Sequence, residues 1–313
     1  MGTFIDPSAR FEPDTLGDGS RVLAYVHVGP EAKIGQNCVV NDHAVVVGDV
    51  VLEDNVNVQA GARLLGRVRL EQGVTIGADA VINGEAQADL DDPSEVIVRR
   101  FASLGPNVTV SPGVVVGRRA VVEAGAVVRQ SVPANAIVSG NPATIVSYVD
   151  SEHASVPAHA AVPASGVAGI TETRVRGVTL HALTNARDLR GSLMAAEFTG
   201  LPFAPRRLFT VYDVPSESVR GAHAHRECAQ FLVCLAGEVS CLVDDGSARE
   251  AIDLDTPEVG LHIPPMIWGT QWKYTQNAVL LVLASHPYDA ADYIRDYEEF
   301  LAEVRDETAL GRM

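Results

Sequence analysis

The stretch that decides the fold of the first half is RVLAYVHVGPEAKIGQNCVVNDHAVV, residues 21–46, because its aliphatic residues recur at every sixth position. From Val28 to Ile82 ten consecutive sixth positions are aliphatic, and the pattern resumes from Leu104 to Val128. A small or β-branched residue stands two positions before each later member. Neither an α-helix nor an alternating strand has a period of six. The pattern therefore predicts a triangular coil of short parallel strands, each pointing one aliphatic residue inward.

The six-residue count breaks between residues 83 and 103. Ile82 and Leu104 are 22 positions apart, which is not a multiple of six. We predict that NGEAQADLDDPSEVIVRRFAS forms a loop extruded from the coil. Loops on a rigid scaffold often carry function, so this loop is a candidate part of a site.

The second half has a different pattern. Residues 151–169, SEHASVPAHAAVPASGVAG, lack a periodic apolar pattern and are typical of a linker. From about residue 171 the period is two, in runs such as RRLFTVYDV and NAVLLVLAS, and VSCLVDDGSAREAIDL has the Asp-Gly turn of a hairpin. Many short antiparallel strands predict a cupin-type jelly roll. We expect a mainly β chain with a coil over 1–150, a linker over 151–170 and a cupin domain over 171–308.

Composition excludes several classes of protein. The net charge of −16 argues against binding of DNA or long polyphosphates, which need clustered lysine and arginine. No uncharged apolar run approaches the ~20 residues of a membrane span. The N-terminus, MGTFIDPSARFEPD, lacks the basic start and apolar block of a secretory signal. The four cysteines form no CxxC pair. We expect a cytoplasmic protein with reduced thiols that binds neither nucleic acid nor membrane.

The first half, residues 1–148, resembles the left-handed parallel β-helix acyltransferases in its repeats and in its ending, which includes Gly140, Asn141, Pro142 and Ala143. More closely it resembles the enzymes that acetylate the amine of a nucleotide-linked 3-amino-3,6-dideoxyhexose, through residues 21–46 and Asn83. The resemblance implies a trimer with acetyl-CoA in the groove between neighbouring coils. It also implies that Gly140, Asn141 and Pro142 contact CoA.

Three residues are candidates for the acetyl transfer. His27 and His43 lie about one coil apart, and either could accept a proton from the attacking amine because the pKa of histidine is near neutral. Alternatively both are surface histidines and the CoA thiolate takes the proton. Asn83 either holds the sugar or is a turn residue. The family follows this asparagine with an aspartate and a Pro-Arg pair, whereas this chain has Gly84 and Glu85.

The second half contains VRGAHAHRECAQ, residues 219–230, in which His223 and His225 share one face of a strand. This pair fits either a metal site or a proton-transfer site. Metal-binding cupins add an acidic ligand and a final histidine, and those two positions fall here on Gln230 and Gly269. Because divalent metals prefer imidazole or carboxylate ligands, the sequence favours a site without metal.

Residues 190–305 resemble the nucleotide-sugar 3,4-ketoisomerases in four motifs that occur in order: RGSL at 190–193, VRGAHAHRECAQFLVCLAGEVSCLVDDG from 219, LDTPEVGLHIPPMIWG from 254, and VLASHPYDAADYIRDYEEF from 282. The resemblance implies that dTDP-4-keto-6-deoxyglucose is the substrate and that its carbonyl moves from C4 to C3. It also implies that His223 and His225 are catalytic. We assign His225 as the base at C3 and His223 as the proton shuttle to C4, and the reverse order remains open.

Other residues of this half are candidate contacts of the substrate. Tyr212 could bind or protonate the sugar, or it packs in the structure. The diphosphate would be bound by arginines, since a guanidinium matches phosphate oxygens; the candidates are Arg207, Arg220 and Arg226. Gln230 would orient a histidine or the sugar.

Together the two resemblances imply a bifunctional enzyme that carries the first and last of three steps. A separate pyridoxal-phosphate aminotransferase would act between them, and the product would be a dTDP-3-acetamido-3,6-dideoxyhexose of galacto or gluco configuration for surface glycans such as O-antigen or S-layer glycan. A trimeric coil and a dimeric cupin would close as a hexamer. Two alternatives are a metal-dependent cupin enzyme and a nucleotide-sugar sensor, each fused to an acyltransferase.

Overall fold

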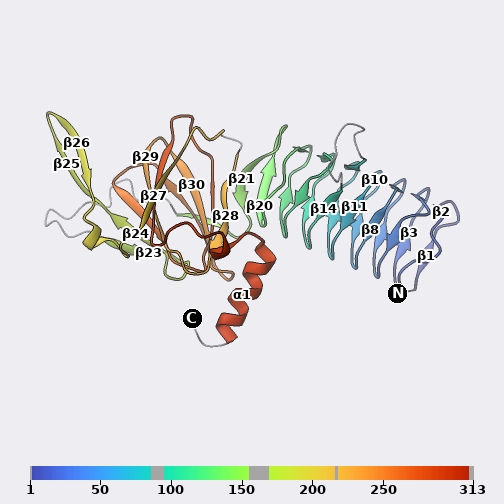
Figure 1. Ribbon diagram of the computed structural model, residues 1–313. Helices are drawn as coiled ribbons and strands as arrows, with labels where there is room; N and C mark the ends of the chain where they lie inside the picture. Colours follow the sequence, from blue (N-terminus) through green and yellow to red (C-terminus); the bar gives the residue numbers. More distant parts are fainter. Residues whose placement is uncertain (1, 86–94, 155–168, 216–217, 310–313) are drawn as a thin grey trace. The chain divides into compact units, whose positions relative to one another are not determined.

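The computed structural model describes residues 2–85, 95–154, 169–215 and 218–309 (Figure 1). The chain divides into two compact units, Met1–Val149 and Asp150–Met313. Two short strands, β22 (Glu152–Ala154) and β23 (Ile170–Glu172), fall at the ends of the range predicted as a linker. Residues 155–168 of that range lie outside the described residues.

The first unit is a solenoid of short parallel strands, which confirms the six-residue prediction. Its described residues form three sheets. The first contains β1 (Phe4–Ile5), β3 (Arg21–Val22), β6 (Val39–Val40), β9 (Asn57–Val58), β12 (Thr75–Ile76), β15 (Ser103–Leu104), β18 (Val121–Val122), β20 (Ala136–Ser139) and β21 (Thr144–Tyr148). The second contains β2 (Arg10–Phe11), β4 (His27–Val28), β7 (Val45–Val47), β10 (Arg63–Gly66), β13 (Val81–Gly84), β16 (Thr109–Val110) and β19 (Val127–Val128). The third contains β5 (Lys33–Ile34), β8 (Val50–Leu52), β11 (Val68–Leu70), β14 (Val96–Val98) and β17 (Val115–Val116).

The period of six places one aliphatic residue of each strand inside the coil. Leu64, Leu70 and Ile76 are fully buried, and so are small residues such as Ala44 and Ala62 two positions before a strand's aliphatic residue. The solenoid is therefore held by a continuous stack of aliphatic side chains, since burial of each contributes about 1.5–3 kcal/mol.

The extruded loop is shorter than the sequence pattern predicted. Strand β14 pairs in parallel with β11, so the coil resumes at Val96 rather than at Leu104. Val98 stands six positions before Leu104 and continues the count. The buried carboxylate of Glu71 fixes the re-entry, because it accepts hydrogen bonds from the Arg99 guanidinium at 2.8 Å and the Arg100 backbone N–H at 3.0 Å. Residues 86–94 lie outside the described residues.

The second unit has the two sheets of a cupin-like jelly roll. In the part that the structure describes, one sheet contains β22, β31 (Arg249–Leu254), β30 (Val239–Asp244), β33 (Trp268–Trp272), β28 (Arg220–His225) and β35 (Tyr293–Ile294). The other contains β23, β24 (Thr179–Ala182), β32 (Val259–Ile263), β29 (Gln230–Ala236), β34 (Val279–Ala284) and β27 (Arg207–Tyr212). The predicted hairpin forms, because β30 and β31 pair antiparallel on either side of Asp245 and Gly246. A smaller hairpin pairs β25 (Thr184–Asp188) with β26 (Gly191–Ala195).

Alternation along β29 creates the interior of the jelly roll. Leu232 and Cys234 point into the main core, whereas Phe231 and Val233 pack in a second cluster on the other side of the sheet. Two short helical turns, η1 (Phe198–Gly200) and η2 (Ala290–Asp292), precede the helix α1 (Tyr297–Ala309). Tyr293 lies in β35, and the helix begins only at Tyr297. Among the described residues, no helix is long and apolar enough to cross a membrane.

Candidate active site

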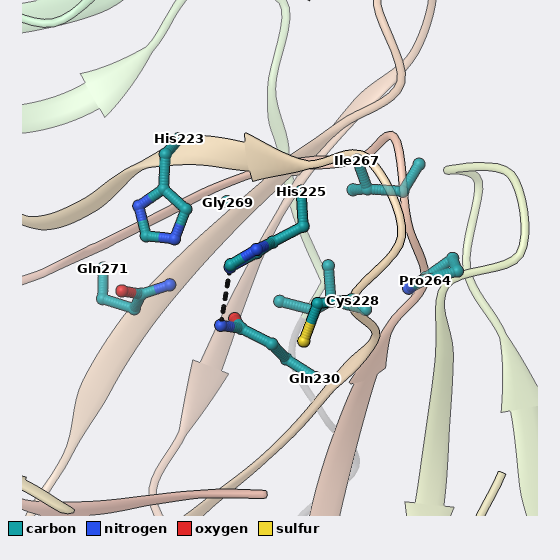
Figure 2. Close-up of a pocket in the computed structure, with 9 residues that line it drawn as sticks. His223, His225, Cys228, Gln230, Pro264, Ile267, Gly269 and Gln271 are labelled. Atoms are coloured by element: carbon teal, nitrogen blue, oxygen red, sulfur yellow. Dashed lines mark hydrogen bonds between the residues drawn. The ribbon is translucent and has the colours of Figure 1, made fainter. Parts of the chain in front are cut away.

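A small pocket opens in the cupin unit around the two histidines (Figure 2). Figure 2 shows His223 and Gln271 on one side of His225, with Cys228 and Pro264 on the other. The pocket has one polar wall and one apolar wall. Its lining residues are His223, His225, Cys228, Gln230, Ile263, Pro264, Ile267, Gly269 and Gln271.

A bulge in β28 presents the two histidines. Gly221 and Ala222 both have positive φ angles, 74° and 53°, and the pairing of β28 with β33 shifts at this point. A Cβ at position 221 would lie 2.7 Å from the side-chain oxygen of Gln271, so glycine is needed there. After the bulge, His223 and His225 share one face, with ring centroids 5.0 Å apart.

His225 has a hydrogen-bond partner at each ring nitrogen. Its Nδ1 lies 2.7 Å from the Oδ2 atom of Asp292, and its Nε2 lies 3.1 Å from the amide nitrogen of Gln230. The other carboxylate oxygen of Asp292 accepts a hydrogen bond from the backbone N–H of Glu227 at 2.7 Å. The imidazole is thus held between an anionic acceptor and an amide donor.

Burial keeps both histidines uncharged near neutral pH. Desolvation lowers the pKa of His223 to about 4, against the opposing effect of its hydrogen bond to the backbone of Gly221. Desolvation also lowers the pKa of His225, and its hydrogen bond to Asp292 opposes that shift. A neutral imidazole can accept a proton, so both rings are suited to proton transfer.

Aromatic and cationic side chains surround the histidines. The ring of Tyr293 lies 4.8 Å from that of His223 and 4.2 Å from that of His225. The guanidinium of Arg295 lies 4.4 Å from the Tyr293 ring centroid, and that of Arg207 lies 5.5 Å from the ring of Tyr288. Two arginines near a polar pocket are suited to an anionic group of a ligand.

Sequence reasoning missed several residues of this site: Cys228, Gln271, Asp292, Tyr293 and Arg295. Three of these lie in the stretch ADYIR at 291–295, which had been noted only as part of a family motif. The available signal was the motif itself. It contains charged and aromatic residues and is shared with the ketoisomerases, although it lies far along the chain from the histidines, and a contact with the active site would explain why.

The structure brings some predicted residues to the pocket and not others. Gln230 lines it, and Arg207 is close enough to lower the pKa of His225 through its charge. Arg220 is exposed and pairs with Gln271 across β28 and β33. Tyr212 is 60% exposed, and alternation along β27 points it away from the side on which Arg207 lies, so its role at the sugar stays a prediction.

Arg226, predicted as a substrate contact, has partners on the terminal helix. Its guanidinium forms ion pairs with Glu299 at 2.7 Å and Glu303 at 2.5 Å, both on α1. It also donates a hydrogen bond to the backbone oxygen of Ala291. The side chain following His225 points to the opposite face of its strand, so Arg226 ties the terminal helix to the sheet.

Among the residues that the structure describes, one group of side chains has ligand atoms close enough to hold a metal ion. Atoms of His225, Cys228 and Asp292 lie within 4.8 Å of one another. The hydrogen bond between His225 and Asp292 accounts for their approach, and the two positions that complete a cupin metal site are Gln230 and Gly269. Imidazole, thiolate and carboxylate are donors that zinc accepts, so a metal-free site remains a prediction.

The candidate histidines of the solenoid occupy different positions on the coil. His27 lies on the flat strand β4, with its Nε2 3.5 Å from the carboxylate of Glu12. His43 lies at a corner with a φ of 60° and stacks on Tyr25, with ring centroids 5.1 Å apart. The catalytic roles of His27 and His43 stay predictions.

The remaining solenoid candidates lie at its turns. The side-chain oxygen of Asn83 accepts a hydrogen bond from the backbone N–H of Glu85 at 3.0 Å, where the chain leaves the coil. Gly140, Asn141 and Pro142 form the turn between β20 and β21, with a cis Asn141–Pro142 peptide. A separate groove beside the corner of His43 is lined by Val39, Asn41, Asp42, Asn57, Gln59, Ala60 and Ala78.

Comparison with known proteins finds different relatives for the two halves of the chain. The family model described as FdtA: WxcM-like, C-terminal matches residues 176–305. A TDP-4-oxo-6-deoxy-alpha-D-glucose-3,4-oxoisomerase of Aneurinibacillus thermoaerophilus is 42% identical over 36% of this chain and 82% of its own length. A dTDP-3-amino-3,6-dideoxy-alpha-D-galactopyranose 3-N-acetyltransferase of the same organism is 34% identical over 47% of this chain and 78% of its own length.

Solved structures include similar chains. A 3,4-ketoisomerase from Helicobacter canadensis is 37% identical, with 41% of this chain and 98% of that chain covered and a TM-score of 0.40. A TDP-quinovose 3,4-ketoisomerase from Campylobacter jejuni is 39% identical, with 41% and 99% covered and a TM-score of 0.40.

Proposed function

Because this chain belongs to the sugar-nucleotide 3,4-ketoisomerases through residues 176–305 and to the dTDP-3-amino-sugar N-acetyltransferases through its first half, we propose that it catalyses two steps of dTDP-sugar biosynthesis. The cupin unit isomerises dTDP-4-keto-6-deoxyglucose to the 3-keto sugar. The solenoid acetylates the amine of a dTDP-3-amino-3,6-dideoxyhexose. The pair of neutral histidines on one strand face, in a pocket with a polar and an apolar wall, is the observation that carries the isomerase assignment.

The isomerisation needs only proton transfers. His225 removes the proton at C3, which is acidic because its loss gives an enediolate shared by C3 and C4. A proton is then delivered to C4 through His223, while the hydroxyl proton moves from O3 to O4. The C4 carbonyl becomes a hydroxyl and the C3 hydroxyl becomes a carbonyl. No electrons leave the sugar, so neither an oxidant nor a reductant is required.

The walls of the pocket suit the two sides of this sugar. Gln230 and Gln271 can hydrogen-bond the hydroxyl and carbonyl groups at C2 to C4. Ile263, Pro264 and Ile267 offer an apolar surface for the methyl group that a 6-deoxy sugar carries. Arg207 and Arg220 would bind the diphosphate, and Arg295 extends that cationic group.

The acetyl transfer uses acetyl-CoA as co-substrate. The amine attacks the thioester carbonyl, the carbon–nitrogen bond forms, and the carbon–sulfur bond breaks to release CoA. The ammonium proton goes to His27, to His43 or to the departing thiolate. Asn83 holds the sugar at the exit of the coil, and Gly140, Asn141 and Pro142 contact CoA.

The chemistry of the two steps requires a third enzyme between them. The 3-keto product must gain an amine before it can be acetylated, which is the reaction of an aminotransferase. We further propose that the enzyme acts in the cytoplasm as a hexamer of trimeric solenoids and dimeric cupins, and that its product enters surface glycans. A mass of three chains in solution by light scattering would contradict the hexamer.

Separation of the two activities tests this proposal. The variant His225→Asn should lose isomerisation and keep acetyl transfer, measured as CoA release with a thiol reagent. The variant Asn83→Ala should lose acetyl transfer to the 3-amino sugar and keep isomerisation. If either variant loses both activities while its fluorescence and oligomeric mass match the wild type, the assignment of the two activities to separate units is wrong.

A further inference from the structure

We propose that Asp292 is a positioning residue that makes His225, rather than His223, the base of the isomerase. The inference rests on the proposed ketoisomerase function of this pocket and deepens it. The observation behind it is the 2.7 Å contact between Nδ1 of His225 and the carboxylate of Asp292, a residue 67 positions further along the chain. Its consequence is a single protonation pattern of the catalytic imidazole.

The carboxylate is held in place from two sides. Its Oδ1 atom accepts the backbone N–H of Glu227 at 2.7 Å, and its Oδ2 atom faces His225. The backbone oxygen of Asp292 accepts the N–H of Arg226 at 2.9 Å. These contacts join the turn η2 to the two residues that follow His225. The carboxylate and the imidazole are therefore fixed relative to each other by short chain segments.

The hydrogen bonds of His225 select one tautomer. A carboxylate only accepts hydrogen bonds, so Nδ1 must carry the proton. In the neutral ring Nε2 then presents a lone pair, and the amide nitrogen of Gln230 can only donate to it. Both contacts agree on this pattern. This Nε2 lone pair faces the pocket, where Gln230 stands (Figure 2), and it can take the proton from C3 once the sugar displaces the Gln230 amide.

His223 has weaker support. Its ring hydrogen-bonds the backbone of Gly221, and the carboxylate of Asp292 acts on it only through its charge and not through the direct hydrogen bond that His225 has. When a base takes a proton it becomes cationic, and an adjacent carboxylate stabilises the cation. The difference in partners therefore decides the order of the two histidines, which the sequence left open.

Other ionisable groups also face His225. They are His223 on the same strand, Cys228, Arg207 from β27, and Tyr293 and Arg295 from the segment after η2. The two arginines disfavour a positive charge on the ring. Asp292 offsets them, and its loss should leave an imidazole that is harder to protonate.

The test compares three variants of the full chain by the rate of isomerisation across pH. Asp292→Asn should lower kcat by about 10²–10⁴-fold with KM within about twofold, and should move the acidic limb of the kcat profile to lower pH. Asp292→Glu should recover part of kcat and return the acidic limb toward its original position. Asp289→Asn is the matched control, because that carboxylate caps the same turn through Ala291, and it should match the wild type.

Two results would overturn the inference. One is a folded Asp292→Asn variant whose acidic limb stays in place, since a merely structural role lowers activity without moving it. The other is a ¹⁵N spectrum of the histidine-labelled wild-type chain in which His225, identified by its loss in His225→Asn, carries its proton on Nε2. The spectrum needs no variant of Asp292. An inactive wild type would instead refute the proposed function itself.

Discussion

His223 lies directly opposite Gly269 in the register of β28 and β33. The strand facing the histidines therefore offers a backbone without a side chain at the position where the metal-binding cupins place their last histidine. At the position of the acidic ligand this chain has Gln230, and the amide of Gln230 donates a hydrogen bond to His225. Space that a ligand side chain would fill is left for a substrate.

The first prediction is that isomerisation is independent of metal. Prolonged dialysis against a chelator should leave kcat unchanged, because no step of the proposed mechanism uses a Lewis acid. Elemental analysis of the purified chain should find less than one equivalent of iron, nickel or zinc. Activity that falls on chelation and returns with one metal would establish the metal-dependent alternative.

The second prediction concerns the amide of Gln230. In Gln230→Glu a carboxylate would face Nε2 of His225 and favour the charged ring. The acidic limb of the kcat profile should move to higher pH by about 1–3 units, with a lower rate at pH 7. The comparison variant Gln230→Met removes the hydrogen bond without adding charge and should not move the limb upward. An unshifted limb in Gln230→Glu would show that the amide does not face the base.

The third prediction separates the two histidines. In deuterated buffer, His225→Asn should slow exchange at C3 of the substrate by at least about 10²-fold. His223→Asn should keep exchange at C3 but form little 3-keto product, because proton delivery to C4 is lost. The opposite pattern would reverse the roles. Unchanged exchange in both variants would instead favour a sensor that binds the sugar.

The fourth prediction is a loss of stability in acid. Burial lowers the pKa of His223 and of His262 to about 4, whereas the unfolded chain binds those protons near pH 6.5. Their contribution is therefore complete above about pH 6.5 and is lost as pH falls toward 4, on the order of 1–3 kcal/mol for each group.

Tryptophan fluorescence can measure this effect in the cupin unit. The chain has 2 tryptophans, Trp268 and Trp272, both on β33, so the signal reports on this unit. Between pH 7 and pH 5 the midpoint of thermal unfolding should fall, and it should fall less in His262→Gln. An equal fall in wild type and variant would mean that His262 is not buried in its neutral form.

The fifth prediction distinguishes two arginines. Arg207→Gln should raise KM for the nucleotide sugar by about 10–100-fold. This is the loss of affinity that corresponds to the free energy of one charge-assisted hydrogen bond. Arg226→Gln should leave KM unchanged and lower stability by about 1 kcal/mol, because its partners are Glu299 and Glu303. Arg305→Gln is the control for stability, because Arg305 is an exposed residue of α1, the helix that carries Glu299 and Glu303. A raised KM in Arg226→Gln would restore it as a substrate contact.

Local periodicity explains how much of the fold was predictable. The six-residue count requires one inward residue per strand, so sequence alone located the coil and its narrow core. The same count could have shortened the predicted loop, since Val98 is in phase with Leu104. The jelly roll was predictable from alternation, but the order of its strands was not, because pairing of distant strands leaves no local pattern.

The site was predictable only where its residues are neighbours in the chain. His223 and His225 were found because they share one strand face, and Gln230 because it stands at the acidic-ligand position of the metal-binding cupins. Asp292 reaches His225 across 67 positions, which only tertiary structure reveals. The partners of Arg226, Glu299 and Glu303, also lie more than 70 positions away in the chain, and only tertiary structure reveals them.

The most direct test of the central claim is incubation of the full chain with dTDP-4-keto-6-deoxyglucose, followed by ¹³C NMR of the sugar. We predict that the carbonyl signal moves from C4 to C3 without added metal or redox cofactor, and that the configuration at the new C4 hydroxyl can be read from its proton couplings. A sugar that is recovered unchanged, or one epimerised with its carbonyl still at C4, would contradict the account.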